Sequence, residues 1–204
     1  NSLSLHPGPN SKQRKGLNKI KKERIILGID PGTTITGYGI IRISGRDPEL
    51  ITIGAIDISK YDDHFLKIKH IFERTLGIIE EYHPDELAIE APFYGKNVQS
   101  MLKLGRAQGA AIAAALSRSV PVFEYAPRKI KMSITGRGSA SKEQVASMLM
   151  QILKFKDMGV KLDATDGLAA ALCHFYQTNN PLGEKKSGSW NDFIKKNPRR
   201  VKKQ

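Results

Sequence analysis

The sequence predicts an α/β protein with a five-stranded mixed β-sheet flanked by α-helices. The first ordered segment is the nearly continuous aliphatic run RIILGID, which is typical of a central strand buried on both faces. Later strand-like segments alternate with long helical patterns, and such crossovers join parallel strands. The expected order of elements along the chain is βββαβαβαα. Because hairpins are followed by crossovers, the sheet is expected to be mixed.

The first half of the chain supplies three strands and a helix. RIILGID, TGYGIIRIS and LITIGAIDI are separated by short polar breaks, and GRDPE is a suitable hairpin connection. These three strands are expected to be antiparallel. Residues 62–82 carry apolar side chains at three- and four-residue spacing, which predicts an amphipathic helix that ends at HPD.

Strands and helices alternate in the second half. ELAIE is a short strand, and APFYGKN leads to a helix over 98–117 whose Gly105, Gly109 and alanines permit close packing, in the core or against another subunit. VPVFEYA is the fifth strand, and the basic segment PRKIKMSITGRGSASK follows it. Helices over about 143–155 and 163–177 complete the expected domain.

Charge is distributed unevenly along the chain, whose net charge is +13. Residues 25–95 hold six basic and twelve acidic side chains, whereas residues 96–161 hold twelve basic and three acidic ones. A chain polarised in this way suits a polyanionic partner, because each phosphate neutralised by Lys or Arg releases condensed counterions. The other explanation is a charge excess that only maintains solubility.

Two basic tails are expected to flank one domain. Residues 1–24 and 179–204 are rich in Lys, Ser, Gly, Pro and Asn and are expected to be flexible, so that the domain spans 25–178. Cys173 is the only cysteine, which excludes a disulfide within the chain and favours a cytoplasmic location, with Cys173 as a small core residue. With no signal peptide or membrane-length apolar run, no membrane partner is expected.

Four acidic residues are placed where they can meet. Asp30 ends the first strand and Glu90 the fourth, so both carboxylates emerge at one sheet edge if these strands are parallel neighbours. Asp163 and Asp166 lie three residues apart and therefore on one face of the last helix. Each acid alone also has a structural explanation, as a turn residue, a solvated strand end, an N-cap or a first-turn acid.

Together, the four carboxylates would repel one another unless cations neutralised them. Hard oxygen ligands without a Cys-His cluster favour Mg²⁺ or Mn²⁺ over Zn²⁺. Two such ions about 4 Å apart can activate water and stabilise the leaving oxygen of a phosphodiester, which indicates a nuclease. GIDPGTT is also similar to the first phosphate loop of actin-like ATPases and sugar kinases, but those folds need two such domains, for which this chain is too short.

Six motifs in combination resemble the RuvC family of bacterial Holliday junction resolvases. They are GIDPGTTITGYGII, AIEAPFYGKN, MLKLGRAQGAA, VFEYAPRKIK, GRGSASKEQV and DATDGLAAALCH, in order over about residues 24–177. The resemblance implies an RNase H-like fold, a homodimer, and paired Mg²⁺-dependent incisions at symmetric positions of a four-way DNA junction during recombination and repair. It also implies two Mg²⁺ ions per active site, replaceable by Mn²⁺, and the RuvA and RuvB branch-migration components as partners.

The resemblance assigns roles to individual residues. The catalytic, metal-binding acids of the family map onto Asp30, Glu90, Asp163 and Asp166. Some relatives carry His where this chain has Asp163. As a hypothesis, Asp30 would contact both metals, Glu90 would bind one, and the pair on the last helix would complete the shell of the other.

Three further residues match family positions that contact DNA: Phe93, Lys131 and Lys142. An exposed aromatic side chain can stack on an unpaired base, although Phe93 could instead be buried under the helix over 98–117. The lysines could belong to a solvated basic face, and SKEQ is also a capping box. His174 is expected to be a packed or hydrogen-bonded core residue and is not assigned to the site.

Two other functions remain open at this point. A junction-binding module without turnover would use the basic half of the chain, but acids beside phosphate bring nothing to pure binding. A related RNase H-like nuclease could act on other branched or RNA-containing substrates, which the lysine and Phe93 motifs disfavour.

Overall fold

The computed structural model describes residues 23–92, 97–156 and 162–179, in which five strands form one sheet in the order β3-β2-β1-β4-β5. The strands are β1 (Arg24–Asp30), β2 (Ile35–Ser44), β3 (Asp47–Asp57), β4 (Glu86–Glu90) and β5 (Val122–Tyr125). β1 is antiparallel to β2 and parallel to β4, so the sheet is mixed, as predicted. Phe93 and nearly all of both predicted tails lie outside the described residues.

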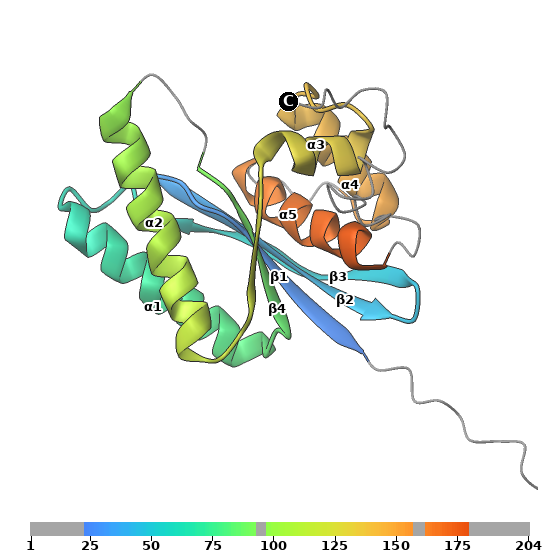
Figure 1. The fold of residues 1–204 in the computed structure, drawn as a ribbon, viewed down its shortest axis with the longest axis horizontal. Coiled ribbons are helices and arrows are strands. Elements are labelled where there is room, and N and C mark those ends of the chain that lie inside the picture. Colours follow the sequence, from blue (N-terminus) through green and yellow to red (C-terminus); the bar gives the residue numbers. More distant parts are fainter. Residues whose placement is uncertain (1–22, 93–96, 157–161, 180–204) are drawn as a thin grey trace, which may run out of the picture.

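Helices cover both faces of the sheet. They are α1 (His64–Tyr82), α2 (Val98–Ser117), α3 (Pro127–Thr135), α4 (Lys142–Ile152) and α5 (Leu162–Asn179). α1 and α2 lie on one face, and α3, α4 and α5 lie on the other (Figure 1). Because side chains alternate along a strand, Leu27 and Ile29 pack in the core beneath α1 and α2, whereas Ile26 packs in the core beneath α5.

Close packing on glycines places α5 across the centre of the sheet. A Cβ atom on Gly28 would lie 2.1 Å from the backbone oxygen of Gly167, so only glycine permits this approach. A Cβ atom on Gly37 would lie 1.8 Å from the backbone oxygen of Asp163. At the other end of the helix, Thr178 accepts a hydrogen bond from Arg24. α5 therefore runs antiparallel to β1, and its first turn lies at the sheet edge where β1 ends.

The basic segment after the fifth strand contains a helix that was not predicted from the sequence. The segment contains α3, which begins with Pro127 in its first turn and ends at Gly136 in the left-handed conformation with φ of 73°. Ile130 and Ile134, four residues apart, are its buried side chains. The signals for both helix ends were present, but the nine residues include five charged or hydroxyl side chains and bury only two apolar ones.

The first hairpin is also tighter than predicted. The turn consists of Gly45 and Arg46 alone, with Gly45 at φ of 76°, and the following Asp47 already pairs with Ser44. Pro48 lies within β3, where its missing N–H is tolerated because β3 is an edge strand.

Cys173 is buried in the core, as expected. No helix in the described segments is both long and apolar enough to cross a membrane.

Candidate active site

Asp30 and Glu90 end two neighbouring parallel strands. The register pairs Ile29 of β1 with Ile89 of β4, so the two acids occupy the next positions on strands that lie about 4.8 Å apart. The parallel pairing on which their predicted proximity depended is therefore present. Ile29 and Ile89, which directly precede the two acids, pack in the core beneath α1 and α2. Because side chains alternate along a strand, the two acids lie on the α5 side of the sheet.

The electrostatics of the two acids show how crowded they are. Burial, followed by the charges of Glu90 and Asp166, raises the pKa of Asp30 to about 8. Burial, followed by the charge of Asp166, raises the pKa of Glu90 to about 7. Near neutral pH these carboxyl groups therefore retain protons in part, unless a cation compensates their charge.

The first two turns of α5 bring the other two acids to the same edge. Asp163 lies inside the first turn of the helix and is not its N-cap, which removes one of the structural explanations for this residue. Asp166 is only 13% exposed at its side chain, and burial raises its pKa while Lys142 opposes this shift. The charges of Asp163 and Asp166 both reach Asp30, so the four predicted acids share one electrostatic environment.

Lys142 contacts the acids directly. Its Nζ lies 2.6 Å from Oδ2 of Asp166 and 3.2 Å from Oδ1 of Asp163. Burial lowers the pKa of Lys142, but the hydrogen bonds and ion pairs with these two carboxylates have the larger combined effect. The pKa of Lys142 therefore lies above its usual value. The capping box is also present, because Ser141 and Gln144 bond each other's backbone N–H. Ser141 therefore caps α4, while Lys142, the first residue of the helix, reaches the acids.

Lys131 approaches the same acids from α3. Its side chain is half-buried, and its positive charge lowers the pKa values of Glu90 and Asp166. The two lysines thus come from the basic half of the chain to the edge where the acids gather.

The acids are not arranged as a closed metal site. Within the described residues, no three His, Cys, Asp or Glu side chains are grouped closely enough to hold a metal ion as they stand. The ammonium of Lys142 lies instead between Asp163 and Asp166. The donors nevertheless fit a hard divalent cation, because the carboxyl groups of Asp30, Glu90 and Asp166, whose pKa values are raised by burial and by neighbouring acids, gain from added positive charge.

Two residues that sequence reasoning missed support the site. The buried side chain of Gln108 on α2 donates hydrogen bonds to the backbone oxygen of Glu90 at 3.2 Å and to the carboxylate of Glu124 at 2.8 Å. The fully buried Thr36 accepts a hydrogen bond from the backbone N–H of Gly32, which fixes the loop after Asp30. Thr36 belongs to a quoted motif, but a lone Gln in an alanine-rich helix gave only a weak signal.

A pocket beside the loop that follows Asp30 was also missed. It is lined by Thr33, Thr34, Lys67 and Lys103, among others, and the Lys67 ammonium contacts the backbone oxygen of Thr33 at 3.5 Å. Lysines and hydroxyl groups of this kind suit the phosphates of a nucleic acid. In sequence, Lys67 and Lys103 look like ordinary residues on the solvated faces of amphipathic helices.

Comparison with known proteins identifies the family. The family model described as "Crossover junction endodeoxyribonuclease RuvC" matches residues 26–174, a range that includes all four acids and both lysines. The chain belongs to the RuvC family. A RuvC protein from Bacteroides fragilis is 67% identical over 183 residues, which cover 89% of this chain and 97% of the relative. RuvC from Cytophaga hutchinsonii is 61% identical over 180 residues, which cover 88% and 89%.

A solved RuvC structure has the same fold. The structure described as "T. thermophilus RuvC in complex with Holliday junction substrate" is similar with a TM-score of 0.69 at 32% identity, and the match covers 75% of this chain and 94% of that one. The predicted RuvC family and the predicted RNase H-like fold are both confirmed. Membership of this nuclease family also implies a divalent metal ion as cofactor.

Proposed function

We propose that this chain resolves Holliday junctions: as a structure-selective endonuclease, it hydrolyses phosphodiesters at symmetric positions of a four-way DNA junction in recombination and repair. Its family consists of crossover junction endodeoxyribonucleases. The observation that supports the assignment of the active site is that acids from β1, β4 and α5 gather at one sheet edge, where their charges raise the pKa values of Asp30, Glu90 and Asp166.

The four acids Asp30, Glu90, Asp163 and Asp166 are proposed to hold two Mg²⁺ ions, which Mn²⁺ can replace. When bound, such ions supply positive charge at the scissile phosphate and lower the pKa of a bound water. The charges of Glu90 on the neighbouring strand and of both acids of α5 act on Asp30, which suits it to a shared role. The chain itself adds positive charge next to the phosphate through Lys131 and Lys142.

DNA contacts are proposed for Phe93, Lys131 and Lys142. The two lysines lie beside the acids, so a phosphate held by them is also close to the carboxyl groups. The proposal for Phe93 rests on the family motif and on the capacity of aromatic rings to stack on unpaired bases.

A homodimer through α2 is the proposed assembly. One side of α2 exposes Val98, Leu102 and Leu116, and Cβ atoms on Gly105 and Gly109 would meet nothing within 4 Å. An apolar stripe with glycines at its centre allows a second copy of the helix to approach closely. Two copies related by a two-fold axis match the near two-fold symmetry of a junction. RuvA and RuvB as partners and a cytoplasmic location belong to the same proposal.

Cleavage of a labelled four-way junction, beside a linear duplex of the same sequence, tests the function. The parent chain, Asp30→Asn and the control Asp47→Asn are compared with Mg²⁺ and with chelator. Asp47 is an exposed acid of the β3 hairpin. We expect symmetric nicks in the junction alone, which require Mg²⁺ and are lost only in Asp30→Asn. Tight junction binding without nicks would indicate a binding module, and equal cleavage of the linear duplex would indicate another nuclease.

A further inference from the structure

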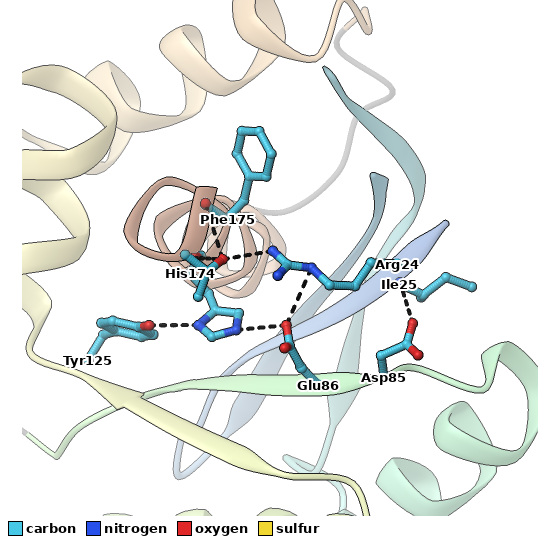
Figure 2. A network of polar contacts seen from close by, with 8 residues as sticks. Arg24, Ile25, Asp85, Glu86, Tyr125, His174 and Phe175 are labelled. Carbon is cyan, nitrogen blue, oxygen red and sulfur yellow. Dashed lines mark hydrogen bonds and ion pairs between the residues drawn. The ribbon is translucent and has the colours of Figure 1, made fainter. Parts of the chain in front are cut away.

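A buried polar network lies at the end of α5 that is remote from the acids (Figure 2). The fully buried ring of His174 has Nδ1 2.6 Å from the hydroxyl of Tyr125 and Nε2 2.9 Å from Oε2 of Glu86. Arg24 places its Nε 3.5 Å from the same oxygen of Glu86. One imidazole thus connects α5 to both β4 and β5.

The partners of His174 determine which ring nitrogen carries the proton. Burial lowers the pKa of His174, and Glu86 only opposes this shift, so the ring is neutral near pH 7. Burial raises the pKa of Tyr125 to about 12, so its hydroxyl keeps its proton and donates to Nδ1. The Nε2–H group then donates to the carboxylate of Glu86, which is a charge-assisted hydrogen bond.

The same strand and helix carry two of the proposed metal-binding acids. On β4, Glu86 and Glu90 are four residues apart on one face, which corresponds to about 13 Å along a strand. On α5, Asp166 and His174 are eight residues apart, which corresponds to about 12 Å along a helix. Since the helix and strand run in opposite directions, contact between His174 and Glu86 at one end aligns Asp166 with Glu90 at the other.

Packing fixes how closely α5 lies to the sheet, and the polar network adds a directional contact. Glycines at the contact let α5 approach the sheet, and the buried side chains of the helix include four alanines together with the larger Leu168, Leu172 and Phe175. The hydrogen bond from the buried His174 to the partly buried Glu86 depends on distance and direction, so it favours one position of the helix.

We propose that His174 is a positioning residue, which through Glu86 sets the position of α5 along β4 and so holds Asp166 against Glu90. The inference rests on the proposed metal site at these acids. Asp166 would bind a cation less well when α5 is free to shift.

Two matched pairs of variants test this inference. The amide nitrogen of Gln can take the place of Nε2, so His174→Gln keeps a donor for Glu86, whereas the shorter Asn in His174→Asn cannot reach it. Glu86→Ala removes the contact from the strand side. Asp85→Ala is its control, because Asp85 accepts a hydrogen bond from the backbone N–H of Ile25 at the same sheet edge and has no such contact with α5 (Figure 2).

Mn²⁺ binding by titration calorimetry, junction cleavage at a series of Mg²⁺ concentrations, and melting temperature are measured for each protein. We expect about tenfold weaker Mn²⁺ binding in His174→Asn and Glu86→Ala, and a higher Mg²⁺ requirement for cleavage, with near-parent values in His174→Gln and Asp85→Ala. Ile71 is a buried residue of α1, so Ile71→Ala provides a destabilised chain in which the network is intact.

The outcomes are distinguishable. Parent-like Mn²⁺ affinity in Glu86→Ala and His174→Asn, with only a lowered melting temperature as in Ile71→Ala, would overturn the positioning role. If His174→Asn does not fold, Glu86→Ala decides, since Glu86 is partly exposed at its side chain. A parent chain that neither binds Mn²⁺ nor cleaves junctions would instead overturn the proposed function, and this inference with it.

Discussion

Lys142 lies with its ammonium nitrogen 2.6 Å from Oδ2 of Asp166. The contact joins the first residue of α4 to the second turn of α5, 24 positions later in the chain. Without a metal ion, this lysine supplies positive charge that partly offsets the raising effect of burial and neighbouring acids on the pKa values of Asp30 and Asp166. Its position makes it suited both to balance the acids and to contact a phosphate.

Lys142→Ala is expected to lower junction cleavage by about 100-fold, because removing a preorganised positive group from a reacting centre typically costs this much. The melting temperature should change little, since the Lys142 side chain is half-exposed and such ion pairs contribute about 0–1 kcal/mol. Single-turnover cleavage and junction binding at low and high salt measure the effect, with Lys154→Ala as a control. Parent-like turnover and binding in Lys142→Ala at both salt concentrations would contradict the assignment.

The stability of the metal-free chain should fall as pH rises. The pKa values of Asp30 and Glu90 are raised to about 8 and about 7, from ordinary values of 3.8 and 4.5. Between these limits the folded chain binds more protons than the unfolded chain, so the free energy of unfolding decreases with increasing pH. Mg²⁺ competes with these protons and should offset the decrease.

Melting temperatures in chelator and in Mg²⁺, at pH 5, 7 and 9, test this dependence. Asp30→Asn isolates the contribution of one acid. We expect this variant to melt about 5 °C above the parent in chelator near pH 8, which corresponds to ~2 kcal/mol for a domain of this size, and to gain less from Mg²⁺. If the two proteins showed the same pH dependence, the acids would not be coupled as described.

Gly28→Ala should strongly destabilise the chain, because its Cβ atom would lie 2.1 Å from the backbone oxygen of Gly167. We expect a loss of about 3 kcal/mol or more, as for other overpacked cores, together with impaired cleavage as α5 is displaced. Denaturant unfolding measures the loss. Gly77→Ala on α1 is the matched control, since a Cβ there meets nothing within 4 Å and alanine should stabilise the helix by about 0.5–1 kcal/mol. Equal effects of the two substitutions would exclude the close packing of α5.

Leu102→Glu should weaken the proposed dimer. Leu102 is 51% exposed within the apolar stripe on α2, so a charge there costs the single chain little but would be buried between two copies. Sedimentation velocity over a range of concentrations should show a dimer for the parent and a monomer for Leu102→Glu. Arg46→Glu in the first hairpin serves as a control for the added charge. An unchanged dimer would place the interface elsewhere.

Elements with a regular or continuous apolar pattern could be predicted from the sequence. The predicted range of the helix over 98–117 is that of α2, and RIILGID and ELAIE are β1 and β4. The proximity of Asp30 and Glu90 followed as well, because strand order and direction determine which strand ends meet. α3 could not be predicted from the sequence, because nine residues with two buried isoleucines do not establish a helical period.

The sequence by itself determined the order of the strands and of every helix except α3, the family, and which acids stand at strand and helix ends. These features depend on local periodicity and on motifs within short segments. Only the tertiary structure decided that Lys142 lies between Asp163 and Asp166, that Gln108 holds the backbone of Glu90, and that His174 contacts Glu86. These contacts join segments far apart in the chain. They depend on how closely α5 can approach the sheet and in which position along β4, which the packing of all the elements together determines.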